Sequence, residues 1–127
     1  MQLSLETPDF DYVLRGANGT SARVNDRQLT RSFIVAPRAL VEDWPVTSVR
    51  TLDLDALARV LALEPEVILL GTGGMQAFPP AATMAACLSR GVGLEAMTNA
   101  AAARTFNVLA GEGRRVVAAF VLEGDDS

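Results

Sequence analysis

A glycine-rich segment follows the most aliphatic run of the chain, residues 67–70. Gly71, Thr72 and Gly73 could present backbone amides to the start of the next helix, an arrangement that binds anions. The segment matches neither the dinucleotide-binding glycine motif nor the phosphate-binding loop with its lysine, and two prolines at 79–80 remove amide donors. A tight structural turn after a strand is therefore the favoured interpretation, and an anion site is the alternative.

A second loop is expected beside the first. Met97, Thr98 and Asn99 follow the next predicted strand. Ligands of open α/β sheets gather where neighbouring parallel strands end. The sequence therefore predicts a cleft with these two loops as its opposite walls.

Three further polar residues lie in and after the last predicted helix. Arg104 and Asn107 are three residues apart and share one face, and Arg115 follows at the turn into the last strand. Asparagine is unfavourable inside a helix, so its side chain either bonds to a loop or partner or belongs to a solvated face. We treat all three as candidates for partner binding.

The residue types that are missing exclude several chemistries. The chain has no histidine, one cysteine and eleven basic residues, all of them arginine. A histidine-based triad, a Cys/His zinc site and a lysine Schiff base are therefore excluded, and Cys87 on an alanine-rich helix is interpreted as a small buried hydrophobe. We expect no metal, no cofactor and no catalytic activity. The catalytic alternative is a hydrolase or isomerase using Glu95 or Glu112 with Thr72 or Thr98.

Charge and hydropathy exclude two classes of interaction, with nucleic acid and across a membrane. Fifteen acidic residues against eleven basic ones give a net charge of −4, which argues against nucleic acid. No apolar stretch reaches the roughly 20 residues of a membrane span. The first ten residues lack a basic, then apolar, signal pattern, so we expect a cytoplasmic protein.

Periodicity and turn residues predict the elements that position these groups. Strands at 10–15 and 20–24 flank a type I′ hairpin turn at Asn18 and Gly19, and a strand at 28–35 is followed by a linker at 40–45. Helices are predicted at 53–64, 79–90 and 98–110, strands at 67–70, 94–97 and 115–122, and a disordered tail at 124–127. This order predicts a single three-layer α/β domain over residues 1–127, with a mixed central sheet flanked by helices and extended by the N-terminal antiparallel hairpin.

Four short segments resemble a known family. VILLGTG at 67–73, GLEAMT at 93–98, RTFNVL at 104–109 and EGRRV at 112–116 are similar to motifs of the domain of unknown function 498 family, which includes mitochondrial complex I assembly factor 3. The resemblance implies a three-layer α/β fold with a mixed sheet and no cofactor or catalytic activity. The mitochondrial members of the family are scaffolds that bind other assembly proteins at the inner membrane. The resemblance therefore implies that this chain has protein partners.

Two functions follow from these observations. The first is a non-catalytic protein-interaction module, assisting the assembly of a larger, membrane-associated complex through the loops at 71–73 and 97–99 and through Arg104, Asn107 and Arg115. The second is a protein that binds a small molecule or anion in the strand-end cleft, using the amides of the glycine loop.

Overall fold

Eight strands form two sheets in the computed structural model, which describes residues 10–123. The elements of the three-stranded sheet are β1 (Leu14–Ala17), β2 (Ala22–Val24) and β3 (Arg27–Leu29). The elements of the five-stranded sheet are β4 (Phe33–Ala36), β5 (Ala39–Val41), β6 (Val67–Gly71), β7 (Gly93–Met97) and β8 (Val116–Phe120). The helices are η1 (Val49–Thr51), α1 (Leu54–Leu61), α2 (Ala81–Ser89) and α3 (Asn99–Gly111).

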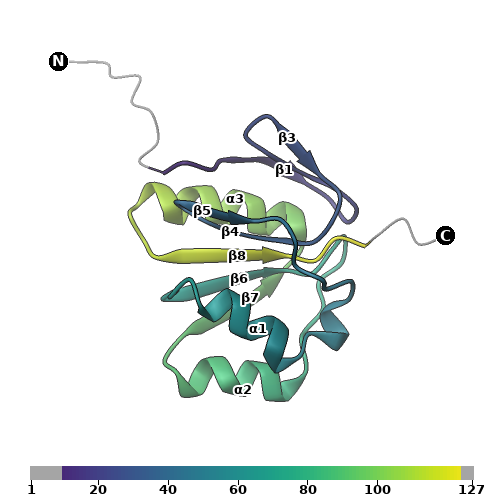
Figure 1. Cartoon of the computed structure of the whole chain (residues 1–127), viewed down its shortest axis with the longest axis vertical. Helices are drawn as coiled ribbons and strands as arrows, with labels where there is room; N and C mark the ends of the chain where they lie inside the picture. Colours follow the sequence, from purple (N-terminus) through teal and green to yellow (C-terminus); the bar gives the residue numbers. More distant parts are fainter. Residues whose placement is uncertain (1–9, 124–127) are drawn as a thin grey trace.

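The larger sheet is mixed, as predicted. Its strand order is β5-β4-β8-β6-β7, in which β6 is parallel to both β7 and β8, and β4 is antiparallel to both β8 and β5. All five residues of β6 are buried, because side chains on both faces of this interior strand are covered. The carboxyl ends of β6, β7 and β8 therefore meet at one edge of the sheet (Figure 1).

Two hydrophobic clusters make the three layers. On one face, α1, α2 and the segment around Trp44 pack against alternate residues of the sheet, such as Ile68 and Leu70. On the other face, α3 and the three-stranded sheet pack against Val67, Leu69 and their neighbours. Figure 1 shows β1 and β3 at the top of the molecule and α2 at the bottom, with the large sheet between them.

The N-terminal strands depart from the prediction. β1, β2 and β3 form a separate sheet that packs on α3, whereas the sequence favoured a hairpin that extends the central sheet. The strand predicted at 28–35 is two strands in different sheets, because the chain breaks after Leu29 and re-enters at Phe33. At the break the buried Ser32 hydroxyl donates to Val46 O and accepts from Leu122 N at 2.9 Å. The predicted linker also contains an edge strand, β5.

The predicted type I′ turn is wrong. The β1–β2 connection has four residues, since Ala17 pairs with Ala22, and neither Asn18 nor Gly19 has a positive φ. Instead, Asn18 Oδ1 accepts from the Thr20 and Ser21 amides, both at 2.9 Å, so the asparagine side chain closes the loop.

Helices α1 and α3 begin where their capping residues predict. Asp53 Oδ1 accepts from Ala56 N at 2.9 Å at the start of α1, and Thr98 Oγ1 accepts from Ala101 N at 3.2 Å at the start of α3. None of the helices within residues 10–123 has the length and apolar character needed to cross a membrane. The tail predicted at 124–127 lies outside the described residues.

Candidate functional site

A cleft of about 990 Å³ opens at the carboxyl ends of β6 and β8. Four chain segments line it: the β1–β2 loop, residues 47–50 before and within η1, the loop that follows β6, and the residues that follow β8. A cleft at the strand ends is therefore present, and Thr72 of the glycine loop lines it as predicted. The loop at 97–99, predicted as the opposite wall, does not line it. Residues 47–50 contribute one wall that no sequence motif pointed to, because they reach the site through the packing of η1.

Asn99 fixes the base of this region. Its side chain is fully buried. Its Oδ1 accepts from Gly73 N at 3.2 Å, and its Nδ2 donates to Asn18 O at 2.9 Å and Val121 O at 3.0 Å. One side chain thus joins three segments around the cleft, and its hydrogen-bonding groups are used within the protein.

Thr72 closes the loop after β6. Its amide donates to Met97 O at 2.8 Å. Its Oγ1 accepts from Ala77 N at 3.1 Å and lies 2.8 Å from Met75 O, to which it can donate. Gly73 N donates to Asn99 Oδ1, so two of the three amides predicted to bind an anion, those of Thr72 and Gly73, already donate within the chain. An anion would have to break those bonds.

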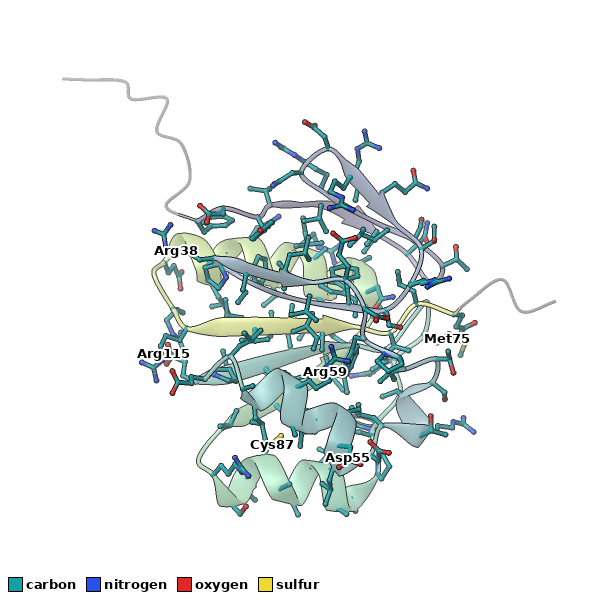
Figure 2. The ribbon with its side chains drawn as sticks, in the orientation of Figure 1. Arg38, Asp55, Arg59, Met75, Cys87 and Arg115 are labelled. Atoms are coloured by element: carbon teal, nitrogen blue, oxygen red, sulfur yellow. The ribbon has the colours of Figure 1, made fainter. Side chains whose placement is uncertain are left out.

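The rim of the cleft is more exposed to solvent than its base, and it carries both apolar and charged side chains. The Met75 side chain, which lines the cleft, is 81% exposed. Arg50 and Glu123 add opposite charges to the lining, and Arg50 forms no ion pair with any residue between 10 and 123. Figure 2 shows Met75 at the edge of the molecule where β8 ends.

The structure brings together six of the nine predicted site residues. Gly71, Thr72, Gly73, Met97, Thr98 and Asn99 lie where β6 and β7 end. Arg104 lies further along α3 with an exposed side chain. Arg115 lies at the opposite end of the sheet from Met75 (Figure 2).

Asn107 has a structural partner in the smaller sheet. Its Oδ1 accepts from Leu14 N at 2.9 Å, and its Nδ2 donates to Leu14 O at 2.8 Å. The pairing of β1 with β2 shifts register between Leu14 and Gly16, so the asparagine bonds a strand that is locally irregular. The Asn107 side chain therefore forms a hydrogen bond, as one of the two interpretations held, but to a strand of the same chain and not to a loop or partner.

Arg115 belongs to a charged cluster with Glu66. Arg115 N donates to Glu66 Oε1 at 2.9 Å, and Arg114 Nε donates to the same oxygen at 3.2 Å. The pKa of the Glu66 carboxyl is lowered, first by the backbone hydrogen bond from Arg115 and then by the Arg114 side chain. The Arg115 backbone thus helps to hold the turn that precedes β6.

This cluster gives a pH prediction. A carboxyl whose pKa is depressed in the folded state stabilises the fold above its unfolded pKa, and this contribution is lost as the pH falls through the folded pKa. We expect Glu66→Gln to lower the urea midpoint at pH 7 and to lower it less at pH 3, which is below the ordinary pKa of a glutamate. The control is Glu95→Gln, which removes an exposed carboxylate from β7. An equal loss for Glu66→Gln at both pH values would contradict the prediction.

Thr98 and Glu112, two of the residues considered for catalysis, lie at opposite ends of α3. Cys87 is buried, and burial raises the pKa of its thiol. Thr98 caps the start of α3, whereas Glu112 caps its end. Within residues 10–123 no three Cys, Asp or Glu side chains cluster in a way that could hold a metal ion.

Comparison with known proteins places this fold and its motifs in a family. The family model described as "Protein of unknown function (DUF498/DUF598)" matches residues 14–121. An NMR structure of a Xanthomonas campestris protein is 56% identical, with a TM-score of 0.85, covering 100% of this chain and 96% of that one. A Bordetella pertussis protein described as an Mth938-like domain is 30% identical, with a TM-score of 0.79, covering 98% of this chain and 94% of that one.

A relative from Danio rerio also supports membership of this family. The Danio rerio protein named NADH dehydrogenase [ubiquinone] 1 alpha subcomplex assembly factor 3 is 30% identical over 122 residues, which are 94% of this chain and 67% of that protein. Residues 14–121, which the family model matches, include the loops after β6 and β7 and the whole of α3. The chain therefore belongs to the DUF498/DUF598 family.

Proposed function

We propose that this chain is a non-catalytic protein-interaction module whose partner binds at the strand-end cleft. The observation that carries this proposal is a cleft of about 990 Å³ with a long apolar side chain, Met75, standing 81% exposed at its rim. Methionine adapts its shape to an apolar partner, and a large exposed apolar side chain beside a hollow is typical of protein interfaces.

The cleft is also preorganised. Asn99 and Thr72 bond the loop after β6 to three other segments, so this wall is already ordered before a partner arrives. Binding to a wall that is already fixed costs less conformational entropy than binding to a mobile loop. Arg50, without an ion pair in the described part of the chain, offers a charged contact to an acidic group of the partner.

Family membership supports the direction of the proposal. The Danio rerio relative is named an assembly factor for a subcomplex of NADH dehydrogenase. We infer that this chain likewise assists the assembly of a larger, membrane-associated complex, by holding one of its protein components. The cleft, rather than a catalytic group, is then the working part of the molecule.

Affinity capture with matched variants tests this function. The chain is immobilised and used to capture partners from a whole-cell extract with detergent-solubilised membranes. We expect Met75→Asp to reduce recovery of a stoichiometric partner about tenfold or more, because a carboxylate replaces an apolar anchor. Val108→Asp makes the same change at a 58% exposed position on α3 and should leave recovery unchanged.

Arg104→Glu distinguishes the cleft from the helix surface that the sequence suggested. Loss of the partner in Arg104→Glu, with full recovery in Met75→Asp, would place the interface on α3 and contradict the cleft proposal. Thermal unfolding of each variant confirms that the fold is intact. Once the partner is identified, titration of the purified pair gives the change in Kd directly.

A further inference from the structure

Helix α2 presents an apolar stripe to solvent. Ala81, Met84, Ala85 and Leu88 recur at the spacing of one helix face, and the Leu88 side chain is 79% exposed. The opposite face is fixed in the protein, since Cys87 is buried and the buried Thr83 Oγ1 donates to Leu52 O at 2.7 Å. The orientation of α2 therefore forces the stripe outward.

The segment that carries the stripe has no charged residue. Residues 71–89 contain no Asp, Glu, Lys or Arg. Six large apolar side chains are exposed among the described residues, and four of them lie directly before α2, on α2, or on the neighbouring α1: Leu54, Phe78, Met84 and Leu88. Figure 1 shows α2 as the outermost element at the bottom of the molecule. Surfaces of this kind mark interaction sites.

Opposite charges stand at the two ends of the stripe. Arg90 directly follows the last residue of α2. Asp53 and Leu54, at the start of α1, line a small pocket of about 280 Å³ together with Pro80 and Ala82, so α1 begins beside the start of α2. Asp55 is exposed nearby, and Figure 2 shows it at this end of the two helices. Neither Arg90 nor Asp55 forms an ion pair within residues 10–123.

We propose that a second copy of this chain covers the stripe, with the two α2 helices packed antiparallel about a twofold axis. In that arrangement the apolar stripe of one copy contacts the same stripe of the other copy. The small side chains of Ala81 and Ala85 permit a close approach of the two helix axes. The end of each α2 then faces the start of α2 and α1 in the other copy. Arg90 of each copy thereby meets the acidic pair Asp53 and Asp55 of the other, twice per dimer.

The same charges argue against a bilayer as the occupant. A helix that lies on a membrane combines an apolar face with a basic rim that attracts anionic lipids. Here the rim has Arg90 at one end and two aspartates at the other. A second copy matches both ends at once. This dimer uses a different surface from the cleft, so the dimer and the proposed function succeed or fail independently.

Sedimentation of the purified chain over a range of concentrations tests the dimer. Because α2 has nine residues and the interface is small, we expect Kd on the order of 10–100 μM. Leu88→Asp should weaken the dimer about 100-fold, since each variant dimer places two carboxylates in the apolar contact. Leu88→Ser, a milder change, should weaken it less, and Val108→Asp should not affect it.

A charge exchange tests the antiparallel arrangement itself. Arg90→Glu and Asp55→Arg should each weaken the dimer about tenfold, and the double variant should regain most of the loss. A wild-type chain that stays monomeric at millimolar concentration overturns the proposal, as does a dimer that survives Leu88→Asp. Failure of the double variant to recover overturns the antiparallel pairing. A monomer that binds phosphatidylglycerol vesicles through Leu88 would show that the occupant is a membrane.

Discussion

Replacing Asn99 by alanine is expected to lower the free energy of unfolding by about 3 kcal/mol. The side chain is fully buried and makes three hydrogen bonds to backbone groups of three different segments. Truncation leaves Gly73 N, Asn18 O and Val121 O without this partner, and the bonds to Gly73 and Val121 are buried. Each unsatisfied buried group costs more than the hydrogen bond contributed, so the effect is large for a single polar residue.

Urea unfolding of Asn99→Ala beside Asn107→Ala measures this effect. Asn107 also bonds a backbone N–H and C=O, but its side chain is only partly buried, so water can replace it. We expect a loss of about 1 kcal/mol for Asn107→Ala. An Asn99→Ala loss no greater than that of Asn107→Ala would show that the Asn99 bonds do not hold the cleft together. Faster amide exchange at Gly73 in Asn99→Ala would locate the change.

Local patterns were sufficient for the elements that surround the cleft. The caps Asp53 and Thr98, the aliphatic run of β6 and the glycines that end the helices act within a few residues of where they stand, so sequence spacing reveals them. The mixed sheet and the meeting of two strand ends followed from the alternation of helices and strands. These parts of the prediction agree with the structure.

The features of the fold that the sequence did not predict depend on hydrogen bonds between residues that are far apart along the chain. The break between β3 and β4 is fixed by Ser32, whose hydroxyl contacts residues 14 and 90 positions away. Asn99 reaches Asn18, 81 positions away, and Asn107 reaches Leu14, 93 positions away. A polar residue at a helix start or in a helix interior looks the same in the sequence whether it meets a ligand, water or a distant strand.

Gly71→Ala is expected to destabilise the protein by about 3 kcal/mol, for reasons of space alone. A Cβ on Gly71 would lie 2.3 Å from Asn99 Oδ1 and 3.0 Å from Phe120 Cδ2. The φ of Gly71 is not in the left-handed region, so its backbone conformation is open to alanine. The methyl group must instead displace the Asn99 amide, and its three hydrogen bonds are lost or distorted with it.

A double-mutant cycle separates this clash from a general packing effect. Once Asn99 is alanine the closest clash is gone, so Gly71→Ala should cost about 2 kcal/mol less in that background than in the wild type. Gly74→Ala, where no atom lies within 4 Å of the added Cβ, is the matched control and should change stability by less than about 0.5 kcal/mol. Additive losses would mean that Gly71 is required by Phe120 rather than by Asn99. Strong coupling would show that the glycine at the end of β6 makes room for the amide that orders the cleft wall.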